Sequence, residues 1–127
     1  MFKTFLSMIL LLSFQAASIP EQPVIDLNKQ YQIDNDMWFE GKLPPARVVL
    51  VHMKDLMGQT SIDGDHVDVV LDSESNVTIS TIRLTLFHEE CHIEEWPGPN
   101  STEDQHGPKW QGCMQRLARE GAFAKVW

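Results

Sequence analysis

The sequence predicts an α+β domain in which a helix, a small three-stranded sheet and two further helices follow one another along the chain. Apolar residues recur at helical spacing before residue 40 and again after residue 77. Between these stretches, three short β-branched segments are separated by turn residues. A chain of 127 residues, 43% of them hydrophobic, fits one domain around one core.

The first predicted helix runs from about Leu27 to Glu40. Tyr31 and Trp38 stand there among Gln, Asn and Asp residues, which is the pattern of a moderately amphipathic helix. Gly41 and the pair Pro44-Pro45 follow and are expected to end it.

Three strands are predicted next, at 47–53, 56–62 and 66–71, and tight turns are expected to join them. The segments RVVLVHM and HVDVVL are rich in β-branched residues. Asp63-Gly64, between the second and third segments, is the strongest hairpin signal in the chain.

A long helix is expected from about residue 77 to residue 96, capped by Asn76 or a neighbouring serine. Pro97-Gly98-Pro99-Asn100 ends it, and a polar loop leads to a last helix that begins near Gly107-Pro108. The apolar stripe of the long helix consists of Ile79, Ile82, Leu86 and Ile93. The last helix is expected to turn Trp110, Met114 and Leu117 to one side.

Residues 1–18 have the layout of a secretory signal peptide, which leaves residues 19–127 as the domain. Lys3 precedes a nearly continuous apolar run of about ten residues, and Ala16-Ala17-Ser18 supplies small residues before Pro20. The run is shorter than the ~20 residues of a membrane-spanning helix, so no stable membrane span is expected. We therefore expect a secreted or periplasmic protein. The alternative is that residues 1–18 form an uncleaved hydrophobic helix and that the protein is cytoplasmic.

The formal charge of −8 and the pI near 4.9 disfavour nucleic acid as a partner, because a phosphate backbone attracts basic surfaces. Two cysteines, Cys91 and Cys113, are too few for a four-thiolate zinc site. In an exported protein they can pair as one disulfide, and free buried thiols are the alternative.

The most informative motif is H-E-x-x-H at residues 88–92. Residues four apart on a helix lie one above the other, so His88 and His92 can bind one ion, for which Zn²⁺ is expected. Glu89 lies beside the open position, where a carboxylate can take a proton from metal-bound water. Glu95 and Gly98 stand where metzincins require Gly and His, which excludes that subclass.

A catalytic zinc site usually has three protein ligands, and His106 is the preferred third. It follows the turn-rich loop, at the start of the last helix, where a chain reversal can return it to the metal. His52 and His66 are weaker candidates because each lies in or beside a strand. Glu120 is the weaker acidic alternative, near the chain end.

Other polar and aromatic groups have simpler interpretations. We expect the helix acids to form a solvated face and the neighbouring large side chains to lie in the core. Asp104 either orients a ligand or caps the last helix. The acids are Glu90, Glu94 and Glu95, and the core candidates are Trp96, Trp110 and Met114.

Three segments together resemble the SprT-like zinc metallopeptidase family: 38–44 (WFEGKLP), 86–92 (LFHEECH) and 106–110 (HGPKW). They are similar to the family's F-N-G-x-L-P, H-E-x-x-H and H-G-x-x-F segments, and the resemblance spans about residues 27–120. It implies a minimal zincin-like fold with His88, His92 and His106 as metal ligands and Glu89 as the general base. Glu40 and Trp110 depart from the Asn and Phe that are frequent at these places.

The resulting hypothesis is a zinc metallopeptidase that hydrolyses a protein or peptide substrate with a zinc-activated water and Glu89. The DNA-protein crosslink repair of the Spartan relatives is not carried over to this acidic chain. The alternatives are a non-catalytic zinc-binding domain and a zinc amidase acting on cell-wall peptides. In zincins the substrate extends along a sheet edge, which the sequence does not identify.

Overall fold

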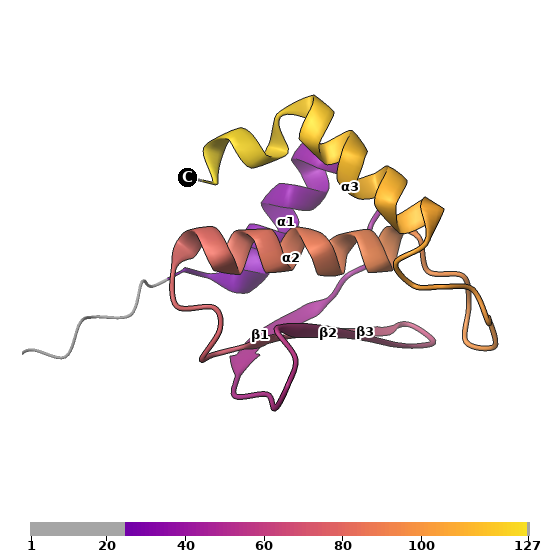
Figure 1. The fold of residues 1–127 in the computed structure, drawn as a ribbon, viewed down its shortest axis with the longest axis horizontal. Coiled ribbons are helices and arrows are strands. Elements are labelled where there is room, and N and C mark those ends of the chain that lie inside the picture. The colour runs from indigo at the N-terminus through magenta and orange to yellow at the C-terminus, as the bar shows by residue number, and fades with distance from the viewer. Residues whose placement is uncertain (1–24, 127) are drawn as a thin grey trace, which may run out of the picture.

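The computed structural model describes residues 25–126, and the expected signal peptide lies outside them. It confirms an α+β arrangement of three helices and a small mixed sheet (Figure 1). The elements are α1 (Leu27–Trp38), β1 (Arg47–Val51), β2 (Gly58–Asp63), β3 (His66–Asp72), α2 (Ile79–Glu94), α3 (Pro108–Glu120) and a 3₁₀ turn η1 (Ala122–Lys125).

Helix α1 begins where Asp26 caps it, its carboxylate accepting the Lys29 backbone N–H at 3.1 Å. It ends, as predicted, before Gly41, which takes the left-handed conformation at φ 70°. The Tyr31 hydroxyl then donates to the Pro44 carbonyl at 2.5 Å, which ties the returning chain to the helix.

The sheet has the order β1-β3-β2, with β3 in the centre. The Asp63-Gly64 hairpin is confirmed: β2 and β3 pair antiparallel, and Gly64 has a φ of 57°. A tight turn between the first two strands was wrongly expected, because β1 pairs parallel with β3 and residues 52–57 lead to the opposite edge of that strand. Strand β2 is therefore a sheet edge.

Helix α2 is capped by Thr78, not by Asn76 or a serine. Thr78 and Thr81 bond reciprocally in a capping box. Asn76 is buried instead, and its side-chain amide donates to the Met57 and Asp72 carbonyls at 2.9 and 2.8 Å. It thereby fixes the loop that precedes the helix against the end of the sheet.

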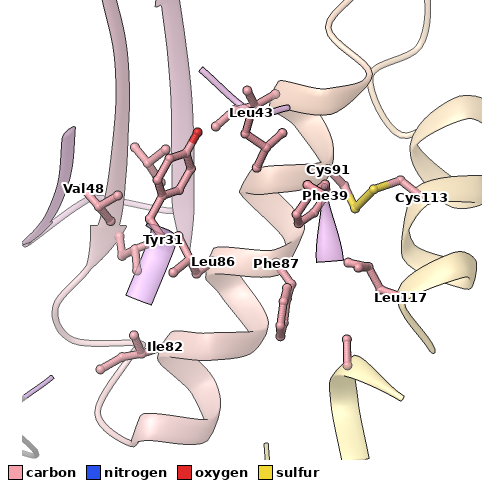
Figure 2. Close-up of a cluster of buried hydrophobic side chains, with 14 of the residues drawn as sticks. Tyr31, Phe39, Leu43, Val48, Ile82, Leu86, Phe87, Cys91, Cys113 and Leu117 are labelled. Carbon is pink, nitrogen blue, oxygen red and sulfur yellow. A yellow bond between two sulfur atoms is a disulfide. The ribbon is translucent and has the colours of Figure 1, made fainter. Parts of the chain in front are cut away.

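The core lies on both sides of α2, because this helix sits between the sheet and α3 (Figure 1). Ile82, Leu86 and Ile93 are buried as predicted, whereas Ile79 in the first turn is 45% exposed. Figure 2 shows side chains from α1, the sheet, α2 and α3 meeting around α2. The other buried apolar residues are Tyr31, Phe39, Leu43, Val48, Val67, Val69, Leu71, Phe87, Leu117, Ala122 and Val126.

A disulfide joins Cys91 of α2 to Cys113 of α3 (Figure 2). The sequence left open whether these residues pair. Both are buried, at 0% and 3% exposure, so the bond lies within the core between the two helices. It links the helix that carries two of the candidate metal ligands to the helix that follows the third.

A solvated position for Glu90 was wrongly expected: the side chain is fully buried beside Asp34 of α1, which is also fully buried. Burial, and then the neighbouring Asp34, raise the pKa of Glu90 well above its usual range. Burial also raises the pKa of Asp34, against the opposing effects of the neighbouring Glu90 carboxyl group, the hydrogen bond from Gln30 and the charge of Arg83. Each of the two carboxyl groups therefore keeps its proton to a higher pH than an exposed acid does.

Asp34→Asn is expected to raise the free energy of unfolding at pH 7 by about 1–3 kcal/mol, the scale of an unsatisfied buried polar group. Because the pKa of Asp34 is raised in the folded state, native stability falls as pH rises above the ordinary value of 3.8, where only the unfolded chain has lost the proton. The stability gained by Asp34→Asn should therefore vanish as the pH falls to about 3.8. Urea unfolding of both proteins between pH 3.5 and 7 measures this difference.

Asp36→Asn, an exposed substitution on the same helix, is the matched control and should leave the pH dependence unchanged. Equal stability changes for Asp34→Asn at every pH would show that the raised pKa has no part in the effect.

Candidate metal centre

Three imidazole rings meet at the end of α2. The Nε2 atoms of His88 and His92 are 3.1 Å apart, and His106 Nε2 lies 3.1 Å from the first and 3.0 Å from the second. The three side chains predicted as ligands are thus brought together, and they are close enough to hold a metal ion.

The weaker candidates lie elsewhere. His52 Nδ1 is 3.3 Å from a carboxylate oxygen of Asp72, and His66 is exposed at the start of β3. Glu120 forms an ion pair with Arg116, at 3.1 Å. Within residues 25–126, only the histidine triad brings three or more possible metal ligands close enough together to hold one ion.

The protonation of the rings suits a metal ligand. Burial, followed by the neighbouring His88 and His106 rings, lowers the pKa of His92 to about 4. Burial and the His106 ring also lower the pKa of His88. Near neutral pH these two rings are therefore uncharged and offer a lone pair to a cation without first losing a proton.

Each ligand has its own structural support. His88 and His92 lie one turn apart on α2, as the i, i+4 spacing requires. Asp104 does not cap α3, because Gly107 occupies the cap position; its carboxylate accepts the His106 backbone N–H at 3.0 Å. The Gln111 side-chain amide donates to the His106 carbonyl at 2.8 Å, so both backbone polar groups of His106 are hydrogen-bonded to side chains.

Glu89 faces β2 and is 3% exposed. The Thr60 hydroxyl donates to its Oε2 at 2.6 Å, and a Cβ at position 58 would lie 2.9 Å from its Oε1, so a glycine there admits the carboxylate. Burial raises the pKa of Glu89, and the bond from Thr60 opposes that shift. Sequence reasoning missed both strand residues; a glycine inside a strand was the available signal of close approach.

The centre lies in a cleft of about 570 Å³ between β2 and the loop that joins α2 to α3. Trp96 was wrongly expected in the core: it is 41% exposed and lines this cleft, because the helix ends one residue before Glu95 and the chain then turns outward. Trp110 is half-buried and lies against the histidines, with its ring centroid 4.7 Å from that of His88. The other cleft residues include Leu56, Gln59, Ile62, Pro97, Pro99, Glu103 and Lys109.

Comparison of the sequence with protein-family models and with curated proteins gave no match. Across residues 25–126, every helix is too short or too polar to cross a bilayer. The inference of function therefore depends on the geometry of the metal centre and on the motifs that form it.

Proposed function

We propose that the domain is a zinc-dependent metallopeptidase of the SprT-like kind. The observation that carries this proposal is the convergence of three Nε2 atoms in a cleft that Glu89 also lines. The three Nε2 atoms lie 3.0–3.1 Å from one another, so the three rings would hold one zinc ion together, as three histidines do in catalytic zinc sites. Neutral imidazoles are ligands that zinc accepts readily.

Zinc bound to the three histidines would supply a water of lowered pKa and polarise a scissile carbonyl. Glu89 is the general base that takes the proton of that water. Thr60 occupies one of its carboxylate oxygens. The other oxygen, Oε1, lies next to Gly58, and both residues line the cleft, so this oxygen is the one left to accept a proton.

The substrate is a protein or peptide in extended form. Strand β2 is a sheet edge and lines the cleft, so its free backbone groups can pair with an extended chain by strand addition. Main-chain pairing of this kind selects an extended backbone before it selects side chains.

The buried disulfide supports an exported protein, because such bonds persist in oxidising compartments. This agrees with residues 1–18 acting as a signal peptide, and both point to a secreted or periplasmic enzyme. The three-ligand group found within residues 25–126 supports a catalytic centre over a closed structural one, which needs a fourth ligand.

Protein beginning at residue 19 should bind one zinc ion and cleave an unfolded protein such as casein. A chelator should abolish cleavage, zinc should restore it, and His106→Ala should lose both metal and activity. Elemental analysis and a cleavage assay measure these effects, with His66→Ala as the control histidine outside the centre.

Peptidoglycan fragments are the second substrate in this assay. Chelator-sensitive release from those fragments, with casein left intact, would identify the amidase instead. Zinc binding without hydrolysis of either substrate would identify a non-catalytic zinc domain.

A further inference from the structure

Trp110, in the first turn of α3, lies against all three histidines of the metal centre. Its ring centroid is 4.7 Å from that of His88, 5.6 Å from that of His92 and 4.8 Å from that of His106. The His92 ring is stacked on the indole at an interplanar angle of 25°, and the other two meet it at 61° and 80°. These are favourable aromatic arrangements.

The polar end of the same side chain is also used. The indole N–H donates to the His88 backbone carbonyl at 3.1 Å. This bond joins the first turn of α3 to α2 and fixes the position of the indole relative to His88. Phenylalanine at this position would preserve an aromatic ring and lose the bond.

Core filling accounts for only part of this position. Cys113 and Leu117 of α3 are fully enclosed in the core, whereas Trp110 is half-buried, packs against the edge of the core and also lines the cleft. Its ring contacts are with the three candidate ligands. His106 is exposed and comes from a loop, so it has the most rotational freedom to lose when an ion binds.

We propose that Trp110 is the positioning residue of the metal centre, holding the three imidazoles in the orientation that the ion requires. Groups that orient metal ligands raise affinity because the ordering cost is met before the ion arrives. A bound dication also makes the imidazoles more positive, which strengthens the attraction between the stacked His92 ring and the indole. The inference rests on the metal-binding part of the proposed function and is independent of hydrolysis.

The test is the zinc dissociation constant of Trp110→Ala and Trp110→Phe, measured by competition with a chromogenic chelator. Trp110→Ala should weaken zinc binding roughly 10- to 100-fold, the range for residues that orient metal ligands. Trp110→Phe should weaken it roughly 2- to 10-fold, the effect of one hydrogen bond. Bound cobalt(II) should show an altered visible spectrum in Trp110→Ala and a near-native one in Trp110→Phe.

Trp96→Ala is the matched control, because Trp96 lines the same cleft and is an exposed residue. It should leave zinc affinity within about twofold, as expected for a surface substitution away from the ligands. Denaturant unfolding of each metal-free variant shows whether that variant is folded. If Trp110→Ala does not fold, the zinc affinity of Trp110→Phe becomes the test.

Wild-type zinc affinity in folded Trp110→Ala, or in Trp110→Phe if Trp110→Ala does not fold, would overturn the proposal, as would an equal loss in Trp96→Ala. Failure of the peptidase proposal is distinguishable: the wild-type protein would then bind zinc and cleave nothing, while the Trp110 comparison still holds. A wild-type protein that binds no zinc overturns both.

Discussion

Replacing Glu89 by Gln is expected to lower peptide cleavage by roughly 10²–10⁴-fold while the bound zinc stays at its wild-type level. The amide has the size of the carboxylate and can still accept the Thr60 hydrogen bond, so the packing against β2 is preserved. It cannot take the proton of the attacking water. Because the base acts in the chemical step, the loss should appear in kcat, with KM little changed.

Glu95→Gln is the matched control for this prediction, since it removes one negative charge from the same cleft without touching Thr60 or the histidines. It should retain most of the activity. Cleavage that persists in Glu89→Gln with full zinc occupancy would show that another group, or none, acts as the base.

The second large effect is expected from the disulfide. Cys91→Ala combined with Cys113→Ala should lower the free energy of unfolding by about 3 kcal/mol, the value for closing a loop of some 20 residues. The two cysteines are 22 residues apart, and the enclosed segment carries both His92 and His106. Freeing the segment in the unfolded state raises its entropy, and denaturant unfolding measures the difference.

Zinc binding should weaken in the same variant, because the third ligand must then be ordered without the bond. Wild-type protein treated with a non-chelating reductant is the control, since it breaks the bond and keeps the side chains. A stability loss in the double variant that reduction does not reproduce would point to cavities in the core, not to the cross-link.

Local features of the fold were predictable from the sequence. The Asp63-Gly64 hairpin depends on two adjacent residues, and it formed as predicted. The start of α3 depends on Pro108, which suits a first helical turn. The proximity of His88 to His92 requires no more than a continuous helix across five residues.

Features that depend on what covers a helix were not predictable. Glu90 reads as a surface acid in a charged helix, yet α1 lies over it and Asp34 meets it there. Trp96 was expected in the core, yet it is exposed, because α2 ends at Glu94 just before it. In each case the amino acid is the same on a buried or an exposed face, and the neighbouring element decides which face it occupies.

The α+β order of elements, the pair of histidines on one helix face and the carboxylate between them were predictable from the amino acids, because they follow from periodicities within one element. Tertiary structure alone decided that β1 pairs with β3, that Thr60 reaches Glu89 and that Trp110 lies under three imidazoles. Except for the contact between Trp110 and the nearby His106, these contacts join segments about 20 or more residues apart, and they form only when burial of a shared core brings those segments together.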